Sequence, residues 1–320
     1  MKDNLAYRAA DNRYDLADKI YARCGRSGVL LPRISLGLWK GFGATRPLNE
    51  SMRMIHYAFD HGITHFDLAN NYGPPYGSAE ETFVVIMEQS MRPYRDEMFI
   101  ATKAGYDMWP GPYGNWGSRK YLMASLDQSL QRMKLDYVDL FYSHRYDPNT
   151  PLDETLQALV DVVRQGKALY VGISRWPLKA LQYAAQYLKA HDVPLLTYQG
   201  RFNLLDRAVE DEGILQEVEN IGCGFVSFSP LAQGLLTERY LHGIPADSRM
   251  RTDVTLKESA LTPQLFEQLN QLKAEAEAVG LTLPQYALQW VLNHPTVTSV
   301  IVGVSKVEQL KENLALLTDN

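Results

Sequence analysis

The chain has 320 residues, of which 46% are hydrophobic, and a formal net charge of −5. This length fits one α/β barrel domain. An acidic balance without long runs of one charge argues against nucleic acid or an anionic membrane surface as a partner. Cys24 and Cys223 lie far apart, and no Cys-x-x-Cys spacing occurs, so we expect no metal site.

The N-terminal segment, residues 1–20, is polar and lacks the apolar stretch of a signal peptide. No apolar run in the sequence reaches the roughly 18 to 20 residues that a transmembrane helix needs. We therefore expect a cytoplasmic protein with a polar N-terminal segment that could be flexible. The remaining residues, 21–320, are expected to form one domain.

Eight short apolar runs alternate with longer helical patterns along the chain. Several are apolar almost throughout, as expected for strands that are covered on both faces. Most begin about one βαβ unit apart, so the pattern predicts an α/β fold with a single (β/α)8 TIM barrel. The runs are Arg33–Leu38, Ile63–Asp67, Met98–Lys103, Val138–His144, Leu169–Ser174, Leu196–Phe202, Gly224–Ser229 and Ser299–Gly303.

Capping residues and apolar stripes mark the helices between these runs. Ser78 followed by Glu81 predicts a capping box at the start of one helix. Ser118 precedes a leucine stripe of helical period, which predicts a second helix. Thr262 followed by Pro263 has the residue types of an N-cap and a first helical position.

Three segments depart from a plain βα repeat. Arg23–Pro32 contains Gly25 and a Ser-Gly pair, which predicts a β-hairpin before the first barrel strand. Residues 105–117 are rich in Gly, Pro and aromatic side chains and are too long for a simple connector. The segment between the seventh and eighth runs is long enough to hold extra helices. Long loops after barrel strands are where active sites are assembled.

Polar side chains end three consecutive apolar runs: Asp67, Lys103 and His144, with Tyr72 in the loop after Asp67. Because barrel active sites lie at the carboxyl ends of the strands, these four should meet on one rim. Each alone is more often a cap, a solvated end or a packing residue. An ammonium beside a phenol would lower the phenol pKa, and a carboxylate would hold the ammonium charged. The set therefore suits acid catalysis of hydride transfer, with His144 orienting a carbonyl.

Three segments of the sequence are similar to motifs of the aldo-keto reductase superfamily, and the resemblance extends over almost the whole chain. It implies that Tyr72 is the general acid, assisted by Lys103 and Asp67, and that His144 orients the substrate carbonyl. The segments are GITHFDLANNYG at 62–73, IATK at 100–103 and FYSHR at 141–145.

A nicotinamide cofactor is also implied by this resemblance. Because no Gly-x-Gly-x-x-Gly motif follows a strand, a Rossmann domain is not supported, and the loops of the barrel are expected to hold this cofactor. Arg249 matches a position that faces the 2′-phosphate, where a guanidinium favours NADPH over NADH. Taken alone, Phe228 and Arg249 would be a core aromatic and a surface charge. The implied cofactor-binding residues are Trp39, Ser174, Arg175, Gln199, Phe228, Ser229, Pro230, Leu231, Gln233, Gly234, Arg249, Gly303, Ser305, Gln309, Glu312 and Asn313.

Residues 105–114 resemble the bacterial L-glyceraldehyde 3-phosphate reductase branch, and voltage-gated potassium channel β subunits are more distant relatives. Those β subunits carry Asn at the position of His144, so His144 favours an active enzyme. We expect a small aldehyde substrate, such as glyceraldehyde 3-phosphate or methylglyoxal. Similar proteins continue past the position of Asn313 into a tail, and a shorter tail would alter the substrate mouth. The expected substrate-binding residues are Trp39, Tyr72, Trp109, Tyr113, Trp116 and Arg145, with Arg145 available for an anionic group.

Two alternative functions stay open from the sequence. A Schiff-base aldolase would need a neutral, nucleophilic Lys103, whereas a neighbouring Asp67 would keep it protonated. An NADPH-binding, redox-sensing partner protein with little turnover would share every cofactor residue, and His144 alone separates it from a reductase. Because similar proteins form tetramers or larger rings, a homo-oligomer is expected as well.

Overall fold

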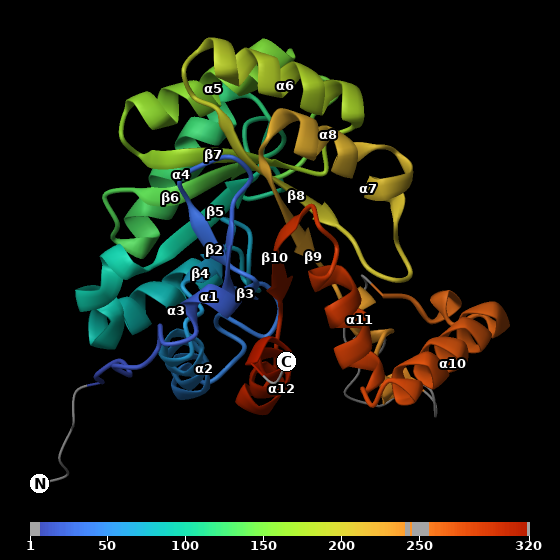
Figure 1. Cartoon of the computed structure of the whole chain (residues 1–320). Helices are drawn as coiled ribbons and strands as arrows, with labels where there is room; N and C mark the ends of the chain where they lie inside the picture. The colour runs from blue at the N-terminus through green and yellow to red at the C-terminus, as the bar shows by residue number, and fades with distance from the viewer. Residues whose placement is uncertain (1–6, 241–243, 245–255, 319–320) are drawn as a thin grey trace, which may run out of the picture.

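A closed barrel of eight parallel strands forms the centre of the molecule (Figure 1). The computed structural model describes residues 7–240, 244 and 256–318. The strands pair in the order β10-β3-β4-β5-β6-β7-β8-β9. The predicted (β/α)8 TIM barrel is therefore confirmed. Its strands are β3 (Ile34–Gly37), β4 (His65–Asp67), β5 (Phe99–Ala104), β6 (Val138–Ser143), β7 (Ala168–Ser174), β8 (Leu195–Arg201), β9 (Gly224–Phe228) and β10 (Val297–Val302).

Helices surround the barrel and connect its strands (Figure 1). Two of them, α10 and α11, precede the last strand and lie at the lower right of Figure 1, which confirms the predicted extra helices. The α-helices are α1 (Ala17–Ile20), α2 (Leu48–Asp60), α3 (Ser78–Ile86), α4 (Arg119–Met133), α5 (Leu152–Arg164), α6 (Leu178–Ala190), α7 (Ala208–Asp211), α8 (Ile214–Ile221), α10 (Pro263–Ala278), α11 (Leu283–Leu292) and α12 (Val307–Thr318). No helix within the described ranges is long and apolar enough to cross a bilayer.

The predicted hairpin is formed by β1 (Tyr21–Arg23) and β2 (Leu30–Pro32), which pair antiparallel. Cys24 and Leu31 of this hairpin pack against barrel-interior side chains such as Leu140 and Val226. The segment before the hairpin is attached to α2 and to the residues before β5. Tyr7 donates a 2.8 Å hydrogen bond to Asp60, and Arg13 pairs with Glu97 at 2.6 Å.

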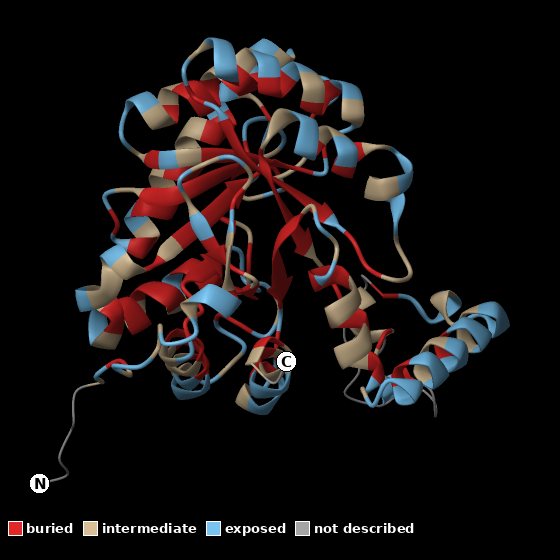
Figure 2. Cartoon of the chain, in the orientation of Figure 1, coloured by how far each residue is buried: buried red, intermediate tan, exposed pale blue. Residues whose placement is uncertain are grey.

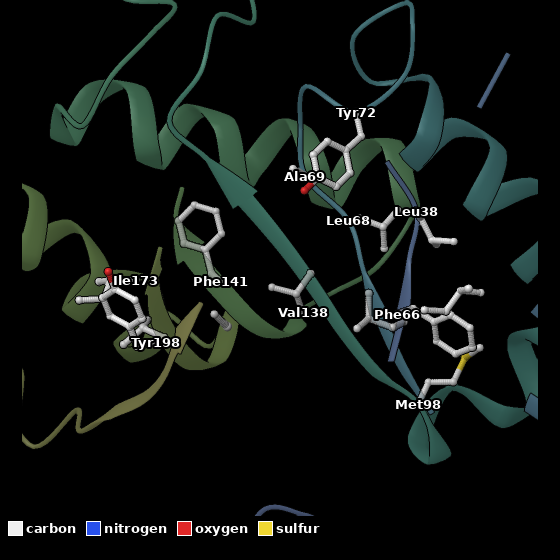
Figure 3. Packing of buried hydrophobic residues seen from close by; sticks show 14 of the residues in the cluster. Leu38, Phe66, Leu68, Ala69, Tyr72, Met98, Val138, Phe141, Ile173 and Tyr198 are labelled. Atoms are coloured by element: carbon white, nitrogen blue, oxygen red, sulfur yellow. The ribbon is translucent and has the colours of Figure 1, made fainter. Parts of the chain in front are cut away.

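The main hydrophobic core lies between the strands and the inner faces of the helices. All residues of β6 and β10 are buried, and in Figure 2 the exposed residues gather on the outer faces of the helices. This pattern explains why the strands read as nearly continuous apolar runs. Figure 3 shows part of the cluster, with Leu38, Phe66 and Leu68 close together and the ring of Tyr72 at one end.

Two of the three predicted helix starts are confirmed. The side chains of Ser118 and Thr262 accept hydrogen bonds from the backbone of the first turns of α4 and α10. The predicted capping box at Ser78 is wrong. Gly77, with φ of 91°, is the N-cap of α3, and Ser78 Oγ has no hydrogen-bond partner within the described chain. Glycine adopts this left-handed conformation without steric cost, so the helix begins at Ser78, one residue earlier than an N-cap at Ser78 would place it.

Candidate active site

The polar residues predicted at strand ends lie on one rim of the barrel. Asp67 is the last residue of β4, Lys103 is the second-last residue of β5, and His144 directly follows β6. Because all barrel strands are parallel, their carboxyl ends meet at the same end of the molecule. The structure thus brings together the four side chains that the sequence singled out.

A buried ion pair is the centre of this group. Lys103 Nζ lies 2.5 Å from Asp67 Oδ2, and it donates further hydrogen bonds to the carbonyl of Leu68 at 2.8 Å and the hydroxyl of Tyr72 at 3.2 Å. The Lys103 side chain is fully buried and that of Asp67 is 3% exposed. Gln199 Nε2 donates to the other carboxylate oxygen of Asp67 at 3.0 Å. Lys103, Asp67 and Tyr72 are therefore each held by at least one polar partner.

Burial controls the proton affinities of this cluster. It raises the pKa of Tyr72 well above 10, and the nearby Asp67 carboxylate raises it further. This differs from the expected lowering by the ammonium, because desolvation of the phenolate outweighs the attraction of Lys103. Burial also lowers the pKa of Lys103, and Asp67 opposes this shift. The phenol of Tyr72 is consequently held in its protonated form.

His144 lies beside Tyr72, with the two ring centroids 5.9 Å apart. Burial lowers its pKa well below 6.5, and the positive charges of Lys103, Arg175 and Arg145 lower it further. The imidazole is therefore neutral near pH 7 and can donate one hydrogen bond. Its Nδ1 atom is buried and has no hydrogen-bond partner among the described residues.

The rim continues from β7 to β9 with groups that could hold a nicotinamide. Ser174 and Gln199 are buried polar residues at the ends of β7 and β8, and Phe228 at the end of β9 is half-buried. A hydroxyl and a primary amide can together serve the donors and the acceptor of a carboxamide. Arg175 follows Ser174 with φ of 58°, and its guanidinium donates to the hydroxyl of Tyr106.

The loop after β9 has an unusual backbone. Ser229, Ala232 and Gln233 have φ of 55°, 46° and 60°, and Gly234 has φ of 101°. Such left-handed positions cost about 1–3 kcal/mol each for non-glycine residues and cluster at ligand-binding sites. Backbone amides in turns of this kind form anion-binding concavities, which fits the pyrophosphate of a dinucleotide. Pro230 is buried, and Leu231 is partly buried within this loop.

The remaining predicted cofactor residues lie after β10 and on α12. A Cβ added to Gly303 would meet nothing within 4 Å, so its surroundings are open. Gln309 accepts hydrogen bonds from the backbone and the hydroxyl of Ser305 at 2.8 and 3.0 Å, which orders the start of α12. Glu312 is exposed and Asn313 is partly buried on the same helix. Arg249 lies outside the described residues.

The aromatic residues expected at the substrate mouth differ in exposure and in their contacts. Trp39, Tyr113 and Trp116 are 37%, 55% and 39% exposed, and the Trp39 ring centroid lies 6.1 Å from that of Tyr72. Trp109 instead packs against Tyr121, with ring centroids 5.1 Å apart, and is partly buried. Trp39 is thus the exposed ring that lies next to the buried polar centre at Tyr72.

A model of the aldo/keto reductase family matches residues 33–319. This chain belongs to the aldo/keto reductase family. It is accordingly an oxidoreductase, and members of the family generally use NADH or NADPH. The family membership confirms the resemblance drawn from the three catalytic motifs.

Two kinds of protein are among those to which this chain is similar. L-glyceraldehyde 3-phosphate reductases of Escherichia coli strains K12 and O157:H7 are each 52% identical over 304 residues, which is 93% of this chain and 88% of theirs. A probable voltage-gated potassium channel subunit beta of Arabidopsis thaliana is 34% identical over 303 residues, 92% of this chain and 90% of that protein. The chain is thus similar to both groups over nearly its full length.

Several residues that shape this aldo/keto reductase site were not found from the sequence. Tyr142 is fully buried under the rim, and its hydroxyl accepts a 2.9 Å hydrogen bond from Thr197. Deeper in the barrel, the hydroxyl of Ser35 forms hydrogen bonds with His65 Nδ1 at 2.8 Å and with the hydroxyl of Ser299 at 2.6 Å. The only sequence signal for these residues is a polar side chain at alternate positions of an otherwise apolar strand, which marks the inward face.

Proposed function

We propose that this aldo/keto reductase reduces small aldehydes with NADPH, and that Tyr72 donates the proton to the carbonyl oxygen. One observation carries the proposal: a buried ammonium, Lys103 Nζ, contacts both the Asp67 carboxylate and the Tyr72 hydroxyl. When bound, NADPH supplies a hydride to the carbonyl carbon. The residues described below then bind the aldehyde and move the proton.

Tyr72 is suited to donate a proton because its pKa is raised and its hydroxyl is protonated near pH 7. As the proton leaves for the carbonyl oxygen, negative charge develops on the phenolic oxygen. Lys103 Nζ, 3.2 Å from that oxygen, stabilises this charge, and Asp67 keeps the ammonium in place. The cluster thus favours proton transfer in the transition state more than in the resting site.

His144 orients the aldehyde in this proposal. Its pKa is lowered, so the imidazole is neutral and donates a hydrogen bond to the carbonyl oxygen without competing as an acid. Its ring lies beside that of Tyr72, so both side chains can contact one oxygen atom. Trp39 and Trp116 would then form apolar sides around the substrate.

For the cofactor, we propose that Ser174 and Gln199 bind the nicotinamide carboxamide and that Phe228 stacks on the ring. Loop residues 229–234 would hold the pyrophosphate, and residues at the start of α12 would bind the adenosine. This assignment is supported by the buried polar groups and the left-handed backbone positions at that rim. The choice of NADPH over NADH depends on Arg249. A cytoplasmic location and a homo-oligomeric assembly stay predictions.

The small-aldehyde substrate is supported by the similarity to the E. coli L-glyceraldehyde 3-phosphate reductases. Glyceraldehyde 3-phosphate and methylglyoxal are the substrates that we propose to test first. NADPH oxidation at 340 nm, measured against these two and against bulkier carbonyls, gives kcat/KM for each. Turnover of short aldehydes in preference to bulky ones is expected, and the absence of turnover with every carbonyl would contradict the proposal.

The same assay separates the main alternative, an NADPH-binding sensor, which is favoured by the 34% identity to a channel β subunit. Tight NADPH binding together with negligible oxidation by any aldehyde would support the sensor. Borohydride trapping of a covalent adduct on Lys103 would instead support an aldolase. The contact between Lys103 and Asp67 argues against the aldolase, because it favours the charged ammonium.

A further inference from the structure

Resting on the proposed reductase function, we infer that Arg175 binds the anionic group, a phosphate or a carboxylate, at the far end of a short aldehyde substrate. This differs from the nicotinamide contact that family resemblance implies for Arg175. It also differs from the sequence-based expectation that Arg145 receives an anionic group. The reason lies in how the two guanidinium groups are held.

The guanidinium of Arg145 is bound by residues of the loop that follows β5. Its Nε donates to the carbonyl of Gly105 at 2.7 Å, and its Nη2 donates to Asn115 Oδ1 at 2.6 Å. The guanidinium carbon lies 3.6 Å from the ring centroid of Trp116 and 4.4 Å from that of Tyr106. Two hydrogen bonds and two stacked rings leave this cation fixed between loop residues, so its main role is to order the substrate-side loop.

The guanidinium of Arg175, in contrast, is held by few contacts. Its side chain is exposed, and in the described chain its guanidinium makes one hydrogen bond, from Nη1 to the hydroxyl of Tyr106 at 3.1 Å. A guanidinium has five N–H donors, so most of its capacity for a bidentate contact is available. Its backbone has φ of 58°, a costly conformation for arginine that is typical of functional sites.

Tyr106 connects Arg175 to the position of the substrate carbonyl. Its ring meets the His144 ring edge-on, with centroids 4.7 Å apart, and its hydroxyl holds Arg175. The guanidinium is therefore separated from His144 by about one tyrosine ring. An aldehyde held at His144 could reach Arg175 with its other end through a short carbon chain, whereas a larger spacer would overshoot it.

The electrostatic surroundings of His144 also favour an anionic substrate. After burial, the positive charges of Lys103, Arg175 and Arg145 are what lower the pKa of His144, so three cations act on the space beside its ring. Asp67 is directed at Lys103 on the inner side of the site. The space next to the imidazole thus has a positive potential, which attracts an anion and repels a cation.

Two pairs of aldehydes test this inference: glyceraldehyde 3-phosphate against glyceraldehyde, and 4-oxobutanoate against butanal. For each pair the readout is the ratio of kcat/KM for the charged member to that for the neutral member. A charge-assisted hydrogen bond contributes about 1.5–3 kcal/mol, so Arg175→Gln should lower this ratio by about 10- to 150-fold. The pair with the larger loss identifies phosphate or carboxylate as the group that Arg175 binds.

A matched control is Arg201→Gln, since Arg201 ends the neighbouring strand β8 and is paired with Asp206 at 3.4 Å. This control should leave both ratios at their wild-type values. If Arg175→Gln leaves both ratios unchanged, or weakens NADPH binding and all four aldehydes equally, the inference is wrong and Arg175 acts on the cofactor. Failure of the proposed function is distinct, because then the wild-type protein would oxidise NADPH with none of the four aldehydes.

Discussion

Replacing Lys103 by Met removes the ammonium between Asp67 and Tyr72 with little change in side-chain length. Coulomb's law with an effective dielectric constant of about 20 gives an attraction of about 7 kcal/mol for unit charges 2.5 Å apart. Desolvation of both charges offsets most of this attraction. Loss of only one partner nevertheless leaves a buried carboxylate without its cation, which costs about 3–5 kcal/mol of unfolding free energy.

Urea unfolding followed by circular dichroism measures this loss in Lys103→Met. The double variant Asp67→Asn with Lys103→Met serves as the control, because it removes both charges and leaves an amide oxygen to accept from Gln199. We expect the double variant to recover most of the lost stability while both variants lose reductase activity. Asp67→Asn alone gives the second single loss. If Lys103→Met is as stable as the wild type, or if the loss in the double variant equals the sum of the two single losses, Lys103 and Asp67 do not stabilise the fold as a pair.

Three further perturbations test other parts of the structure. A Cβ at Gly172 would lie 2.5 Å from the Tyr142 ring, so Gly172→Ala should cost about 1–3 kcal/mol and lower the Tm; an unchanged Tm would contradict this packing. His65 has a pKa of about 4 in the folded chain against about 6.5 when unfolded, so the unfolded chain binds more protons between these values. Stability should therefore fall by about 3 kcal/mol as the pH falls through this window, and His65→Gln should remove that part of the pH dependence; parallel pH curves would refute it. Trp116→Ala removes a ring stacked on Arg145, so KM should rise for all aldehydes with little change in the unfolding free energy, and an unchanged KM would exclude a role in ordering the loop.

The barrel could be predicted because its strands are covered on both faces and therefore appear as apolar runs of similar spacing. The start of α3 could not be predicted, because it depends on the left-handed backbone of Gly77, and Ser78 with Glu81 resembles a capping box. The buried pair of Ser35 and His65 was also missed. These residues meet only because β3 and β4 are neighbours in the closed barrel, which is not visible in either strand alone.

The position of the candidate catalytic residues could be predicted for a simple reason. Asp67, Lys103 and His144 lie at or near the carboxyl ends of consecutive parallel strands, so their place in the sequence determines the rim on which they lie. The choice between Arg145 and Arg175 as an anion-binding group could not be made in this way. It depends on contacts with Asn115 and Trp116 in another loop, and such contacts between loops are not local in sequence.

Tyr72→Phe provides the most direct test of the proposed chemistry, because it removes one hydroxyl and retains the ring. The measurement is the rate of NADPH oxidation at saturating aldehyde, with NADPH affinity determined separately by fluorescence. Loss of a general acid predicts a fall in kcat of about 100- to 10,000-fold with NADPH binding retained. Oxidation of NADPH by Tyr72→Phe at the wild-type rate would contradict the account.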